Sequence, residues 1–176
     1  MKTQIIRLSI LLITLFVSYP TFAQKEFVGK INQANKQGKK EGLWIENNTH
    51  YIDYMYYHNG NPNGMFYRIK KTNNSLVWLG ELSNGDYSGI YYMFSDYGHL
   101  IEEMKDFQKN IKKSIEHQTQ GICHFSCYCI NYYPNGNKKS EGTLLFDDTP
   151  VMDSFEYGEW KYYDENGNLT KTKVFK

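Results

Sequence analysis

Short stretches rich in aromatic residues recur along this chain, and Asn-Gly pairs separate several of them. Four of the pairs lie at residues 59–60, 84–85, 135–136 and 166–167. Asn-Gly is the strongest short-range signal of a β-hairpin turn, because both residues tolerate a positive φ. Tyr, Phe and Trp are in addition favoured in strands. The pattern therefore predicts a mainly β protein built from short antiparallel hairpins.

A glycine motif repeats with a regular spacing: Gly, three residues, Gly, any residue and then an aromatic residue. It occurs at residues 38–44, 60–66 and 85–91. The stretch 158–169 matches 89–100, since in both the aromatic residue precedes the turn glycine by seven positions. A longer version occupies residues 133–142. The residues that define the units are Gly42, Trp44, Gly64, Phe66, Gly89, Tyr91, Gly158 and Trp160.

The residue types of this motif have a physical reason. A glycine in the second position, such as Gly89, fits a β-bulge or a place where a neighbouring strand or ring comes close. The aromatic residue two positions later lies on the same strand face. One hairpin is too small to bury its own face, so neighbouring hairpins must stack. The sequence therefore predicts an elongated sheet or solenoid of hairpins.

These units resemble MORN repeats, and more specifically those of the bacterial MORN-repeat variant family. The resemblance covers roughly residues 35–101 and 132–175. It implies rows of antiparallel hairpins and a non-enzymatic scaffold or binding role. Bacterial members are often labelled antitoxin components, whereas eukaryotic MORN proteins are associated with membranes and assembly. The chain departs from a regular array at about 102–131, where we expect an insertion.

Within this insertion, apolar residues at spacings of three, four and four predict one face of a short helix over 105–118. These residues are Met104, Phe107, Ile111 and Ile115. Such a helix would serve for docking or would pack over the sheet. The alternative is that residues 100–107 continue as the return strand of the preceding hairpin.

The chain has three cysteines, Cys123, Cys127 and Cys129, and all lie in a predicted strand over 122–133. At about 3.3 Å per residue, Cys123 and Cys127 are too far apart for a disulfide, and Cys127 and Cys129 are near the limit. We expect buried, apolar thiols. A strained or intermolecular disulfide and a metal site remain the alternatives, although the spacing does not match a structural zinc pattern.

The first residues have the layout of a secretory signal peptide. Lys2 and Arg7 precede an apolar run over 8–17, and the segment ends at Ala23. We expect cleavage between Ala23 and Gln24, export to the periplasm, cell surface or medium, and one mature domain over 24–176. The apolar run is shorter than the roughly 20 residues that span a membrane. No transmembrane segment is therefore expected in the mature chain.

Composition and motifs narrow the class of function. The net charge of +1 gives no electrostatic basis for binding nucleic acid. The chain lacks a His-x-x-x-His pair, a Gly-x-Ser-x-Gly elbow and a Gly-Lys-Ser/Thr phosphate loop. We therefore predict no catalytic residue, no cofactor and no metal, and a binding or scaffold module of the cell envelope.

Seven aromatic residues are candidates for a flat binding strip: Tyr51, Tyr54, Tyr56, Tyr57, Tyr67, Trp78 and Tyr92. The alternative is that they form the core of a thin sheet. The predicted partner is another protein or an envelope component, and self-association through edge strands is a further expectation. Two other functions stay open: an antitoxin or immunity-type inhibitor of an envelope-acting protein, and an envelope enzyme acting on glycans or peptides.

Overall fold

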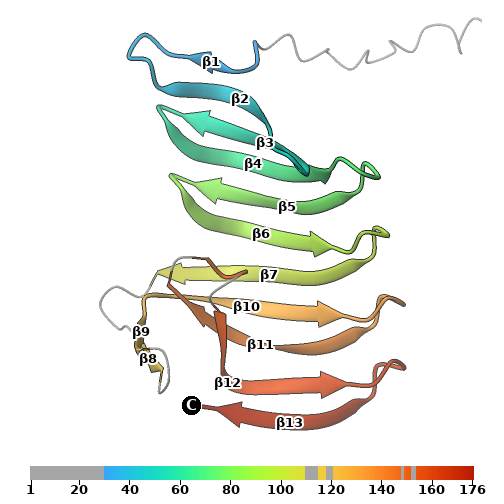
Figure 1. The fold of residues 1–176 in the computed structure, drawn as a ribbon. Coiled ribbons are helices and arrows are strands. Elements are labelled where there is room, and N and C mark those ends of the chain that lie inside the picture. The colour runs from blue at the N-terminus through green and yellow to red at the C-terminus, as the bar shows by residue number, and fades with distance from the viewer. Residues whose placement is uncertain (1–29, 110–114, 118–120, 148, 152–153) are drawn as a thin grey trace, which may run out of the picture.

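The computed structural model describes residues 30–109, 115–117, 121–147, 149–151 and 154–176. The predicted signal peptide and its cleavage site lie outside these residues. The described chain forms one open antiparallel sheet of eleven strands, which follow one another in space in the order of the sequence (Figure 1). The strands are β1 (Gln33–Ala34), β2 (Lys40–Asn47), β3 (Tyr51–His58), β4 (Asn61–Lys70), β5 (Leu76–Ser83), β6 (Asp86–Phe94), β7 (Leu100–Lys109), β10 (Phe125–Tyr132), β11 (Lys138–Phe146), β12 (Ser154–Tyr163) and β13 (Leu169–Phe175).

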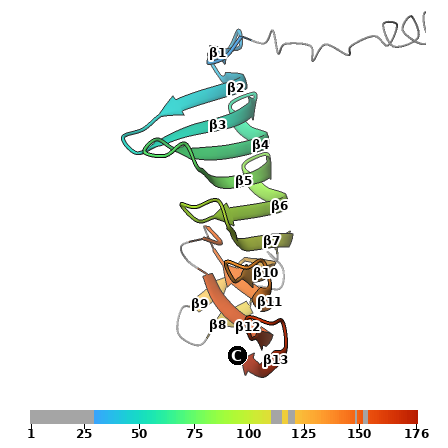
Figure 2. The same ribbon diagram turned by 90° about the vertical axis from the view of Figure 1, so that its right-hand side faces the viewer.

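Two further strands, β8 (Ile115–His117) and β9 (Gly121–Cys123), pair only with each other, beside the lower part of the sheet (Figures 1 and 2). Both views show the strands of the main sheet stacked like the rungs of a ladder, with β1 at one end and β13 at the other. The prediction of a mainly β protein made of hairpins in an elongated sheet is confirmed. No helix in the described residues is long and apolar enough to cross a bilayer.

The predicted hairpin turns form in two ways. Asn59-Gly60 and Asn84-Gly85 have positive φ at both residues, which gives tight two-residue turns. Gly136 and Gly167 lie in two separate, longer loops of the same type. In each, the glycine N–H donates to the carbonyl three residues earlier, at 2.9 and 3.0 Å. In each case an Asn-Gly pair that was visible in the sequence ends a strand.

Two of the repeat glycines, Gly89 and Gly158, lie at irregular points of the ladder. Gly89 has a φ of +63° and faces the register shift between Leu79 and Glu81 of β5. Gly158 has a φ of +66° and faces the shift between Glu141 and Thr143 of β11. A left-handed backbone at these points favours glycine. The prediction that these glycines occupy bulges is therefore confirmed.

A close approach of rings occurs at Gly142, the second glycine of the longer unit over 133–142, and at Gly80, which lies outside the units. A Cβ atom on Gly142 would lie 2.5 Å from the ring of Trp160, and one on Gly80 would lie 2.9 Å from the ring of Tyr91. The aromatic residue of a unit thus crosses over a glycine of the strand before it. Trp160 is only 1% exposed as a result of this packing and of its burial in the core.

Most of the buried apolar side chains lie on one face of the sheet, which we call the core face, whereas Ile130 and Leu145 are buried on the opposite face. The side chains on the core face form one cluster: Phe66, Leu82, Tyr91, Met104, Cys127, Cys129, Leu144, Phe146 and Trp160. The connection between β11 and β12 helps to cover this face. Pro150 is fully buried, Val151 packs against the cluster, and the hydroxyls of Thr149 and Tyr87 lie 3.5 Å apart.

The predicted helix over 105–118 is wrong for the residues that can be compared. Residues 105–109 belong to β7, which pairs with β10, and residues 115–117 form β8; residues 110–114 and 118 lie outside the described part. The alternative of a return strand over 100–107 is confirmed. Residues 102–109 and 125–131 of the expected insertion are strands of the main sheet, and of the described residues between them, β8 and β9 lie outside that sheet.

A bulge explains why this strand had a helical spacing. Asp106 has a φ of +55°, and the pairing of β7 with β10 shifts register there. The extra residue brings Met104 and Phe107, three positions apart, onto the core face together. A bulged strand can therefore show the apolar spacing of three residues that is typical of a helix.

The three cysteines are free and buried, with exposures of 4%, 2% and 0%. This confirms the favoured prediction of buried thiols. Burial raises the pKa of Cys127 to about 12, and it raises the pKa of Cys129 as well. These thiols are therefore poor nucleophiles.

Candidate binding groove

The sheet divides the seven candidate aromatic residues between its two faces. Tyr51 and Tyr57 are separated from Met55 of β3 by even numbers of residues, so they lie on the same face as Met55, which packs on the core cluster. Trp78 packs on this cluster too. The other four, Tyr54, Tyr56, Tyr67 and Tyr92, alternate with core-face residues and lie on the opposite face. Tyr54 and Tyr67 stack there at a centroid distance of 4.4 Å. The seven residues therefore do not form one strip.

A groove lies on the core face, over strands β2 to β6. It has a volume of about 200 Å³, and residues 149 and 151 of the β11–β12 connection line it together with the strands. Its lining is largely aromatic and apolar, with three charged side chains, Glu46, Asp53 and Arg68. An apolar concavity with a few convergent polar groups is the usual form of a binding site.

Arg68 forms the polar centre of this groove. Its Nε donates to Oδ1 of Asp53 at 2.5 Å, and its Nη2 donates to Oδ2 at 2.8 Å. Asp53 lies directly opposite Arg68 on the neighbouring strand. The hydrogen bonds to Asp53 raise the pKa of Arg68, so its guanidinium keeps its positive charge. Such a two-bond pair fixes the plane of the guanidinium.

Aromatic rings hold the same guanidinium from other sides. Its central carbon lies 4.1 Å from the ring centroid of Trp78 and 5.1 Å from that of Tyr51. Cation–π contacts of this kind are worth about 0.5–2 kcal/mol, depending on desolvation. The guanidinium of Arg68 is therefore held in one orientation, with its planar set of hydrogen-bond donors between aromatic rings.

A second cluster with the same composition lies at the β2 end of the groove. Lys40 pairs with Glu46, and its ammonium lies 4.7 Å from the ring of Trp44 and 4.6 Å from that of Tyr57. The hydrogen bond to Glu46 raises the pKa of Lys40. The repeat tryptophan Trp44 thus contributes to a charged, half-buried cluster, not to the buried core.

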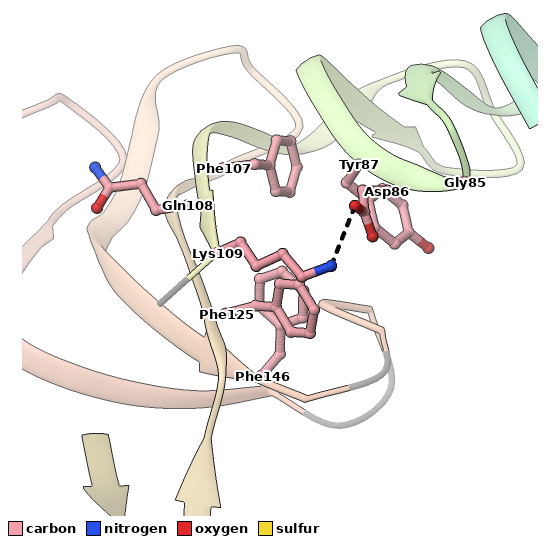
Figure 3. Close-up of a pocket in the computed structure, with 8 residues that line it drawn as sticks. All are labelled: Gly85, Asp86, Tyr87, Phe107, Gln108, Lys109, Phe125 and Phe146. Carbon is pink, nitrogen blue, oxygen red and sulfur yellow. Dashed lines mark hydrogen bonds and ion pairs between the residues drawn. The ribbon is translucent and has the colours of Figure 1, made fainter. Parts of the chain in front are cut away.

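A smaller pocket adjoins the groove, and Tyr87 lines both (Figure 3). Its volume is about 120 Å³. Figure 3 shows the rings of Phe107, Phe125 and Phe146 around it, and the ion pair between Lys109 and Asp86 at its side. Both cavities therefore combine aromatic rings with a cation that is paired to a carboxylate.

One half-buried carboxylic acid, Glu102, lies apart from the residues that line these cavities. Burial raises the pKa of Glu102 to about 7, against a hydrogen bond with Cys129 that lowers it. Burial also raises the pKa of Tyr91. Glu102 and Cys129 both lie on the core face, next to the fully buried Met104. Within the described residues, no group of three or more His, Cys, Asp or Glu side chains is arranged to hold a metal ion.

No family model, curated protein or solved structure matches this chain. The resemblance to MORN repeats therefore stays a prediction, as does the export of the protein. The site has to be interpreted from its own chemistry.

The sequence patterns gave no direct indication of the charged residues in and beside the two cavities: Lys40, Asp53, Arg68, Asp86 and Lys109. One indirect signal was present. Tyr51 and Asp53 are two residues apart, and in a strand residues at this spacing share a face. Their partner Arg68 follows only from the register, which depends on the bulge at Gly64.

Proposed function

We propose that this protein is an exported, MORN-like binding or scaffold module of the cell envelope, and that its groove contacts another protein. The observation that carries the proposal is the fixed Arg68–Asp53 pair between Trp78 and Tyr51 inside a concave, aromatic part of an otherwise open sheet. Arginine and aromatic residues are the side chains that most often dominate the energy of a protein interface.

The charges of the groove favour recognition over acid–base chemistry. Asp53 is engaged by Arg68 in two hydrogen bonds, and Glu46 is paired with Lys40. A general acid or base instead needs a proton that it exchanges near neutral pH. Glu102, whose pKa is about 7, does not line the groove. The groove is therefore suited to contribute planar hydrogen bonding and apolar contact.

The test is affinity capture from cells that make the tagged full-length protein. The informative variant is Asp53→Asn combined with Arg68→Gln, which removes both charges and leaves neither one buried alone. The matched control is Glu103→Gln with Lys105→Gln, an ion pair at 2.9 Å on the opposite face of β7. Both variants are first checked by thermal melting for a folded state.

We expect one partner protein to co-purify with the wild type and with the control, and its yield to fall at least tenfold with the groove variant. A partner whose own activity is blocked in the complex would make the module an inhibitor. Equal capture by the groove variant and the wild type would contradict the proposal.

A further inference from the structure

Four aromatic rings from four different strands enclose the smaller pocket (Figure 3). Phe107 stacks on Tyr87 with a centroid distance of 5.6 Å, and Phe125 stacks on Phe146 at 5.5 Å. The two pairs meet almost at right angles, because Phe146 is turned by 89° from Tyr87 and by 85° from Phe107. The result is a box with ring faces on more than one side.

The chain already places a cation at this box. The ammonium of Lys109 lies 5.3 Å from the ring centroid of Phe125 and 3.4 Å from Oδ2 of Asp86. The side chains of Lys109 and Asp86 are 48% and 57% exposed, respectively. An ion pair that is this exposed contributes little stability, so Lys109 can leave the box at small cost.

We propose that this box is a binding site for an organic cation of the quaternary ammonium class, which takes the place of the Lys109 ammonium beside Asp86. Ring faces carry a negative potential that attracts cations, and quaternary ammonium ligands are recognised in this way. Asp86 supplies the opposite charge. The proposal does not depend on the function proposed for the groove.

The size of the pocket limits the ligand. Pockets that hold drug-sized molecules have volumes of about 300–1,000 Å³. The present pocket, at about 120 Å³, fits a compact head group and not a whole larger molecule. Free choline and the head group of a phosphatidylcholine lipid share this quaternary ammonium chemistry. The rest of such a ligand would remain outside the box.

Calorimetric titration of the full chain with choline tests the proposal, and 3,3-dimethylbutan-1-ol is the neutral control of the same shape. We expect saturable binding of choline and at least tenfold weaker binding of the alcohol. Asp86→Asn should weaken choline binding at least fivefold. Lys109→Met should strengthen it, because the competing ammonium is gone. Both substitutions are at exposed side chains, so the fold should persist.

Two outcomes would overturn the proposal. Equal affinity for choline and the alcohol would show an apolar pocket without preference for charge. Failure of choline to bind either the wild type or Lys109→Met would show that the box takes no such cation. Sedimentation with phosphatidylcholine vesicles separates the two sources. Vesicle binding that Asp86→Asn weakens supports a lipid head group, and choline binding without vesicle binding supports a free quaternary ammonium compound.

Discussion

The two ends of the sheet use the same hairpin unit for different purposes. Trp44 in β2 and Trp160 in β12 occupy equivalent positions, and the indole N–H of each donates to a backbone carbonyl of the preceding strand, at 3.2 and 2.9 Å. Trp160 is 1% exposed and packs in the core cluster. Trp44 is only half-buried, beside Lys40 and Glu46.

The difference arises from the number of buried side chains around each tryptophan. At the Trp160 end, the core cluster extends over β7, β10, β11 and β12. Strands β2 to β4 contain a single buried side chain, that of Phe66. There, cations held between carboxylates and rings take the place of a core. The repeat therefore provides strand pairing. The burial of its aromatic residue among other side chains determines whether this residue stabilises the fold or remains available to a ligand.

The largest expected effect is an unequal response to the loss of the two tryptophans. Trp160→Ala should lower the free energy of unfolding by about 3–5 kcal/mol, since it empties a packed core site. Trp44→Ala should lower it by about 1 kcal/mol, because its ring is half-buried and its cation contact is worth only about 0.5–1 kcal/mol. Urea denaturation measures both. Equal losses would contradict the division into a covered and an open end.

A second prediction concerns pH and the covered face. The pKa of Glu102 is about 7 in the folded protein, above the ordinary value of 4.5. The wild type should therefore lose stability as the pH rises from about 4.5 through 7, because the half-buried side chain must ionise. Glu102→Gln cannot ionise, so its advantage over the wild type should grow by about 1–3 kcal/mol between pH 5 and pH 8.

Denaturation at the two pH values provides the measurement, and Glu159→Gln is the control, since Glu159 is 58% exposed. The control should differ from the wild type by the same amount at both pH values. A Glu102→Gln variant that follows the wild type at both pH values would show that the carboxyl group of Glu102 is solvated.

Much of the fold was predictable because it depends on local backbone chemistry. Asn59-Gly60 and Asn84-Gly85 adopt the positive φ values that their residue types allow, and Gly89 and Gly158 lie at bulges. The burial of the cysteines followed from their preference for apolar surroundings. In each case a few consecutive residues determine the result.

The groove was not predictable, because it depends on how many residues each bulge inserts. Continued without a bulge from the pair His58 and Asn61, the hairpin of β3 and β4 would place Asp53 opposite Phe66. The bulge at Gly64 advances the register by two residues, and Asp53 meets Arg68. The bulge at Asp106 likewise gave the strand β7 a spacing of apolar residues that is typical of a helix.

The most direct test of the open end as a binding surface is photo-cross-linking in the cells that make the protein. Tyr51, beside Arg68 on the core face, and Tyr92, on the opposite face, are replaced in turn by the photoreactive p-benzoylphenylalanine. The account predicts a cross-linked partner from position 51 and none from position 92. A partner captured only from position 92 would contradict it.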